Sequence, residues 1–257
     1  MTGILVTHFL ILLFIFIRIL AALVTAPLFN NRAIPVMAKI ALSLVISYII
    51  FSFIDNSAIK LEFSIWFIII NTIKEVLTGA IIGFSVNLLF HGISFAGTLM
   101  GFDIGLSMAQ IFNPVDETNN NVIGETYNIL AILILILING HHYIIRGLAY
   151  SFTVVPLGTF SLNENIYDYI IKLGSTVFVL AVKIASPILV SFFLIHIAEG
   201  IMAKTMPQMQ VFFVTYPVKI GLGIFLIIAS FPLYVYVIKN LLSTYEDELY
   251  KLIQMMG

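Results

Sequence analysis

Cysteine is absent from this chain of 257 residues. The absence excludes disulfides and thiolate metal sites, but it leaves the cellular compartment open. Charge is also scarce, because only 10% of the residues are charged and the net charge is −1. No basic field therefore indicates binding of nucleic acid. The N-terminus lacks the basic segment of a signal peptide, so we interpret residues 4–29 as a retained helix.

Apolar residues are abundant instead: they make up 61% of the chain, and the mean hydropathy is +1.10. A soluble fold of this length cannot bury so much apolar surface, so lipid or other membrane subunits must cover it. The apolar stretches lie at about 4–29, 36–54, 63–90, 92–112, 127–139, 141–160, 170–200 and 208–238. Several are interrupted or shorter than a full span. We predict an all-α membrane protein with about six to eight helices, some of them incompletely spanning hairpins.

Six charged side chains lie well inside these stretches: Arg18, Lys74, Glu75, Asp103, Lys183 and Lys219. At the centre of a lipid-exposed helix each would cost roughly 2.5–3.5 kcal/mol. Lys74 and Glu75 are adjacent, so on a helix they point about 100° apart and do not pair with each other. We predict that the six charges serve contacts between subunits, with a proton relay as the alternative.

Two glycine patterns predict close helix packing. Gly79 and Gly83 are four residues apart, and so are Gly97, Gly101 and Gly105. Small residues at this spacing let a neighbouring backbone approach closely. The neighbour is either another helix of this chain or another subunit, and Asp103 between two of the glycines needs a hydrogen-bond donor.

A polar segment follows the second glycine pattern, and its apolar residues distinguish it from a simple solvent loop. Pro114 cannot continue a helix, and asparagines favour turns. We predict a channel plug that seals by apolar contact, although a plain connecting loop is an equally weighted alternative. The candidate plug residues are Ile111, Phe112, Asn113, Pro114, Val115, Asn119, Asn120, Asn121, Val122 and Ile123.

Signs of catalysis or cofactor binding are weak. His196 and Glu199 share a helix face, but no second ligand pair accompanies them, so an internal hydrogen bond is favoured over a metal. Serine-hydrolase, nucleotide-binding and dinucleotide-binding motifs do not occur. We predict no enzyme, no cofactor and no metal.

The C-terminus forms a separate amphipathic segment in this interpretation, with domain 1–238 and an amphipathic helix at 239–257. Its apolar stripe consists of Leu242, Tyr245, Leu249, Leu252 and Met256. The polar face is acidic, so a protein partner is favoured over anionic lipid.

The ordered set of these features resembles the R-subunit family of type III export gates, FliR in flagella with injectisome counterparts, over nearly the whole chain. The matching residues are Arg18, Pro27, Pro35, Lys39, Glu75, Gly79, Gly83, Gly97, Gly101, Asp103, Gly105, Asn113, Pro114, Asn139, Gly140, His141, His142, Ser151, Pro156, Gly158, Pro187, Gly200, Pro207, Gln208, Phe212, Pro217, Lys219, Ile220 and Gly223. The chain departs from the family pattern at Asn113, Lys204 and Gln210.

The resemblance implies a helical, multi-subunit export gate in the bacterial inner membrane, within the flagellar basal body. Its implied partners are the P and Q subunits (FliP, FliQ), the switch protein FlhB, the export component FlhA, unfolded flagellar substrates and membrane lipid. The resemblance also implies that the loop at about 111–123 plugs the closed channel. A secondary transporter for a small solute or protons is the alternative function; an intramembrane enzyme lacks a recognisable catalytic set.

Overall fold

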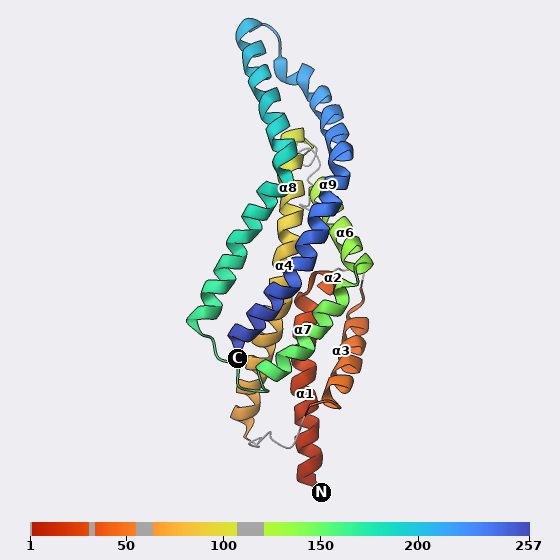
Figure 1. Ribbon diagram of the computed structural model, residues 1–257, viewed down its shortest axis with the longest axis vertical. Helices are drawn as coiled ribbons and strands as arrows, with labels where there is room; N and C mark the ends of the chain where they lie inside the picture. Colours follow the sequence, from red (N-terminus) through yellow and green to blue (C-terminus); the bar gives the residue numbers. More distant parts are fainter. Residues whose placement is uncertain (1, 31–33, 55–63, 107–120) are drawn as a thin grey trace. The chain divides into compact units, whose positions relative to one another are not determined.

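A computed structural model of the chain describes residues 2–30, 34–54, 64–106 and 121–257. Within these residues all regular structure is helical (Figure 1). The eight described helices are α1 (Thr2–Thr25), α2 (Pro27–Asn30), α3 (Val36–Phe51), α4 (Ile65–Ile104), α6 (Val122–Leu137), α7 (Gly140–Val154), α8 (Glu164–Thr205) and α9 (Val211–Met256). Four of them, α1, α4, α8 and α9, are long and apolar enough to cross a membrane, and α6 with α7 forms a fifth candidate as a broken pair. The prediction of an all-α membrane protein is confirmed.

The apolar stretches do not correspond one to one with the helices. Helix α4 (Ile65–Ile104) joins parts of the stretches at 63–90 and 92–112 into one helix, which continues through His91 and Gly92. Helix α8 contains Pro187, and α9 contains Pro217 and Pro232. Proline is tolerated in such helices when neighbouring groups satisfy the freed backbone carbonyls. The Ser186 hydroxyl does this for Pro187, because it donates at 2.8 Å to the carbonyl of Lys183, four residues before the proline.

The chain divides into two compact units that interleave along the sequence. Unit 1 comprises Met1–Leu88, Asn139–Leu173 and Leu242–Gly257, and unit 2 comprises Leu89–Ile138 and Gly174–Leu241. Helix α9 runs without interruption through the predicted boundary at residue 238. The proposed division into 1–238 and 239–257 stays a prediction.

The core of unit 1 forms where α1 packs on α3 and α7. Its buried apolar residues are Ile11, Ile15, Ile19, Leu23, Ile46, Ile50 and Phe152. Helix α3 also buries two serines, and each satisfies its hydroxyl within its own helix. Ser43 donates to the Lys39 carbonyl at 2.7 Å and Ser47 to the Ser43 carbonyl at 2.5 Å. Such i to i−4 bonds let a polar residue sit in an apolar core at little cost.

The C-terminal stripe is covered by the chain itself. Leu242, Leu249, Leu252 and Met256 are at most 5% exposed within the chain. The methyl groups of Leu249 pack directly against Gly147 of α7. An external protein partner, which the amphipathic pattern favoured, is therefore not needed to bury this stripe.

Candidate functional site

A fully buried ion pair joins α1 to α4 in unit 1. The Arg18 Nε donates to Glu75 Oε2 at 2.5 Å, and neither side chain has any exposed surface. The Arg18 guanidinium also lies over the Phe152 ring, 4.3 Å from its centroid. Because removing one partner of such a pair leaves an uncompensated buried charge, the two residues depend strongly on each other.

Arg18 also binds the end of α7. Its Nη1 donates to the carbonyls of Ser151 at 3.1 Å and Val155 at 2.9 Å. The Val155 carbonyl lies beyond the last turn of the helix, where backbone acceptors lack partners within the helix. The guanidinium therefore satisfies a helix end and a carboxylate at once.

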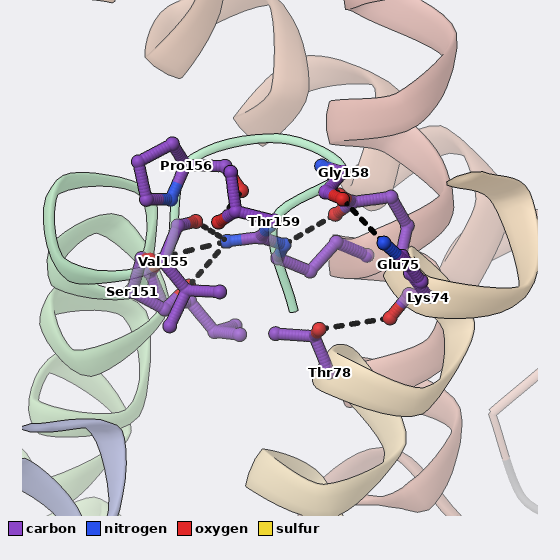
Figure 2. Close-up of polar contacts among 10 residues, drawn as sticks. Lys74, Glu75, Thr78, Ser151, Val155, Pro156, Gly158 and Thr159 are labelled. Carbon is purple, nitrogen blue, oxygen red and sulfur yellow. Dashed lines mark hydrogen bonds and ion pairs between the residues drawn. The ribbon is translucent and has the colours of Figure 1, made fainter. Parts of the chain in front are cut away.

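Glu75 and its neighbour Lys74 hold a single glycine from both sides, as Figure 2 shows. The Gly158 amide donates to Glu75 Oε1 at 2.8 Å, and the Lys74 ammonium donates to the Gly158 carbonyl at 2.9 Å. Gly158 has a φ of +77°, a conformation that favours glycine, and a Cβ there would lie 2.6 Å from Asn71 Oδ1. We call Arg18, Lys74, Glu75 and Gly158 the clamp.

The first glycine pair packs against α1 next to the clamp. A Cβ on Gly79 would collide with the Arg18 carbonyl, and a Cβ on Gly83 would collide with the Ala22 carbonyl and the Thr25 hydroxyl. The two carbonyl contacts are backbone to backbone, the Thr25 contact is with a side chain, and all of them lie within one chain. The glycine spacing left two alternatives open, and these contacts match packing on another helix of the same chain. Packing of these glycines on another subunit stays a prediction.

The second glycine pattern anchors the start of α6 in unit 2. A Cβ on Gly97 would lie 2.7 Å from the Gly124 Cα, and one on Gly101 would overlap the Asn121 side chain. Asn121 caps α6 by accepting from the Ile123 amide at 3.0 Å, and its amide nitrogen approaches the Thr98 carbonyl at 3.4 Å. The tight approach at Gly101 therefore makes room for a helix cap.

The last glycine of this pattern ends α4. Gly105 has a φ of +93°, and its carbonyl accepts from the Tyr216 hydroxyl at 2.6 Å. The Tyr216 ring lies 2.8 Å from where a Gly105 Cβ would be. Tyr216 was not among the predicted site residues, since an aromatic residue in an apolar helix carries no distinguishing signal.

Of the candidate plug residues, Asn121, Val122 and Ile123 belong to the part of the chain that the structure describes. Asn121 and Ile123 are buried, whereas Val122 is 69% exposed. The others, Ile111, Phe112, Asn113, Pro114, Val115, Asn119 and Asn120, lie outside the described residues. Their role stays a prediction.

The remaining predicted charges lie in unit 2. Lys219 of α9 pairs with Glu199 of α8 at 2.7 Å, and Asp103 of α4 lies 4.0 Å from His196 of α8. The expected internal bond between His196 and Glu199 is present at 3.2 Å. Lys183 is exposed on α8 and joins neither group.

The sequence pattern indicated partners for these charges on other subunits, and the structure supplies partners within the chain for Arg18, Lys74, Glu75 and Lys219. Gly158 escaped notice as a partner because it lies 83 residues from Glu75. The turn-forming sequence Pro156-Leu157-Gly158 after an apolar helix was the available signal. Further intersubunit contacts of the six charges stay a prediction.

Fold and site together define an all-α membrane protein whose buried charges and glycines connect its own helices. A family model described as bacterial export proteins, family 1, matches residues 9–245. The chain belongs to this family.

Named relatives cover most of the chain. The flagellar biosynthetic protein FliR of Bacillus subtilis (strain 168) is 29% identical over 95% of each sequence. The FliR of Pectobacterium carotovorum is 31% identical, over 85% of this chain and 83% of its own. The FliR of Escherichia coli (strain K12) is 28% identical, over 84% and 82%.

Proposed function

We propose that this chain is a non-enzymatic subunit of the flagellar type III protein export gate in the bacterial inner membrane, where it helps to form and plug the channel for unfolded flagellar proteins. The observation that carries the proposal is the family match across residues 9–245, together with relatives named as flagellar biosynthetic proteins. The matched residues include nearly all of the described helices, so the proposal applies to the whole fold.

The surface of unit 2 supports assembly with other subunits. The α8 and α9 segments of this unit expose large apolar side chains along their length, among them Phe178, Val190, Phe193, Leu194, Val218, Phe225 and Ile228. Gly200 and Gly221 on the same helices have no heavy atom within 4 Å of where a Cβ would be. An open glycine beside apolar side chains is the pattern of a helix face that accepts another helix at short range. FliP and FliQ are the proposed occupants, with lipid covering the rest.

The contacts of the described residues on either side of the plug segment support its proposed role. Tyr216 fixes the Gly105 carbonyl before the loop, and Asn121 packs on Gly101 after it. Both anchors lie within unit 2: the first ties the end of α4 to α9, and the second ties the start of α6 to α4. A loop with fixed ends and apolar residues between them can fill a closed channel and still be displaced by a passing chain.

The transporter alternative receives no support from the cavity in unit 2. This pocket, of about 360 Å³, is lined by His91, Ser94, Phe95, Thr98, Val177 and Phe178. A solute site of a transporter gathers charged groups or helix ends around the ligand. None of the ion pairs of unit 2 that the structure describes lines the pocket.

Co-expression with FliP and FliQ tests membership in the gate. The full chain should copurify with both as a defined complex in mild detergent. Replacing Gly200 and Gly221 by leucine should abolish copurification, because both positions lie on the open apolar faces of α8 and α9. Leucine at Thr205, an exposed polar residue of α8 that lies about 140° around the helix from Gly200, serves as the matched control. Failure of the unaltered, folded chain to bind either subunit would refute the proposal.

A second experiment addresses the plug. Replacing Ile111, Phe112 and Val115 by serine keeps the loop length and both anchors, and it should leave the complex assembled but permeable to ions. Replacing Asn119 and Asn120 by serine is the control and should not raise conductance. An assembled serine triple variant with unchanged conductance would show that the loop only connects two helices.

A further inference from the structure

Four ionisable side chains from three helices meet in unit 2. Asp103 comes from α4, His196 and Glu199 come from α8, and Lys219 comes from α9. With His196 neutral, this group carries a net charge of one negative unit. Lys219 and Glu199 are largely buried, with side chains 7% and 12% exposed, whereas the His196 side chain is 46% exposed. The histidine is therefore the least buried member of the group, and the Glu199 carboxylate and the Lys219 ammonium beside it are held in place.

The surroundings of the His196 ring cannot all be satisfied in one protonation state. Its Nδ1 lies 3.2 Å from the Glu199 Oε2, an acceptor, and 3.4 Å from the Lys219 Nζ, a donor. Its Nε2 faces the Asp103 Oδ1 at 4.0 Å. A ring nitrogen either donates or accepts, so Nδ1 can bond only one of its two neighbours at a time.

The neutral ring satisfies most contacts when the proton is on Nε2. It then donates toward Asp103 and accepts from Lys219, and only the Glu199 contact places two acceptors together. The protonated ring donates to Glu199 through Nδ1 and toward Asp103 through Nε2. It then opposes the Lys219 ammonium, because two cationic donors face each other at 3.4 Å.

We propose that His196 is a proton-binding site that exchanges hydrogen-bond partners: it bonds Lys219 of α9 when neutral, and Glu199 of its own helix when protonated. The ligand is a single proton, which brings the charge of the group from one negative unit to zero. No other bond is made or broken, and the Lys219–Glu199 ion pair persists in both states. Proton uptake thus removes the polar contact between His196 of α8 and Lys219 of α9.

A distance measurement on the full chain in lipid bilayers tests the proposal. The chain has no cysteine, so single cysteines at the exposed positions Ile197 and Val218 can carry spin labels without background. Their mean separation should increase by on the order of 1–2 Å, the usual size of a helix shift, between about pH 8 and about pH 5. The change should disappear in His196→Gln and persist in His91→Gln, a matched control on an exposed histidine of the same unit.

The histidine itself can be observed by nitrogen NMR of the isotope-labelled chain, with His196 assigned by the signal that His196→Gln lacks. In the neutral ring Nδ1, which accepts from Lys219, should be unprotonated, and Nε2, which faces Asp103, should be protonated. An unchanged label distance across the pH range, a change that persists in His196→Gln, or a neutral ring protonated on Nδ1 would each overturn the proposal.

Discussion

Removing the positive charge of the clamp should destabilise unit 1 far more than an average substitution. In Arg18→Met the Glu75 carboxylate stays buried without its counterion, which costs about 3–5 kcal/mol of the free energy of unfolding. Glu75→Leu leaves the Arg18 guanidinium buried without its carboxylate, and the expected loss of the free energy of unfolding is of the same size. Both side chains are fully buried, so water cannot replace the missing partner.

The double variant Arg18→Met with Glu75→Leu distinguishes charge pairing from simple packing. It removes both charges, and the remaining loss is the Gly158 amide and the Val155 carbonyl, each left without its side-chain partner. Two such buried groups cost about 1–3 kcal/mol each, or about 2–6 kcal/mol together. The sum of the two single variants would be about 6–10 kcal/mol, so the pair should show a coupling of roughly 4 kcal/mol.

The assay is unfolding of the purified full chain in mixed detergent micelles, followed by circular dichroism. Lys74→Met is the control, since this lysine is only partly buried and makes one bond to the Gly158 carbonyl, worth about 1.5–3 kcal/mol. Additivity of the two single substitutions, or an Arg18→Met variant within about 1 kcal/mol of the unaltered chain, would refute the reasoning from the buried pair.

Four further outcomes follow from backbone geometry and the exposed histidines. Gly158→Ala should lose about 1–3 kcal/mol by the same unfolding assay, because its φ of +77° and the nearby Asn71 exclude a Cβ. Gly79→Ala should lower the thermal midpoint, because a Cβ there would force α1 away from α4. Gly174→Ala meets open space and should raise the free energy of unfolding by about 0.5–1 kcal/mol. A less stable Gly174→Ala than Gly79→Ala would contradict the packing argument. Tyr216→Phe should cost about 1 kcal/mol through loss of the bond to the Gly105 carbonyl, and an unaffected stability would remove this anchor. His142→Gln, at an exposed position, should leave flagellar export in a complementation assay unchanged, and a selective export defect at normal abundance would argue for a catalytic or relay role.

The sequence predicted the fold class because apolar runs of span length with so few charges need lipid or other membrane subunits to cover them. It did not predict that α4 is a single helix of 40 residues. His91 and Gly92 look like an interruption in a hydropathy plot. In unit 2, however, Gly92 lies beside Val177 of α8, with 3.3 Å between its potential Cβ and the Val177 carbonyl. Gly92 is therefore a position where two helices pack closely, and not a break in α4. The contact is with a residue far away in the sequence, so a hydropathy plot cannot show it.

The sequence showed that the buried charges need polar partners, but it did not show which groups those partners are. Their positions inside an apolar stretch showed that Lys74 and Glu75 each need a polar partner elsewhere in the protein. In the structure both bond Gly158, Glu75 at its amide and Lys74 at its carbonyl. The partner itself is the backbone of Gly158, and sequence alone does not specify which distant peptide group a side chain will bond. The expectation of partners on other subunits arose because internal backbone acceptors and donors are invisible to a search for opposite charges.

The close-packing glycine and the buried charge of α4 act as one device. Glu75 and Gly79 are four residues apart and therefore share a helix face. At Gly79 the missing Cβ lets the Arg18 carbonyl reach the surface of α4, and this approach brings the Arg18 side chain within 2.5 Å of Glu75. Apolar contact in a membrane does not select one helix register over another, since lipid is as apolar as leucine. A directional ion pair does select a register, but only where the two backbones can come close enough to form it. The spacing of a small residue and a carboxylate on one face thus determines where α1 lies on α4, and through Val155 and Gly158 it also determines where the chain leaves α7.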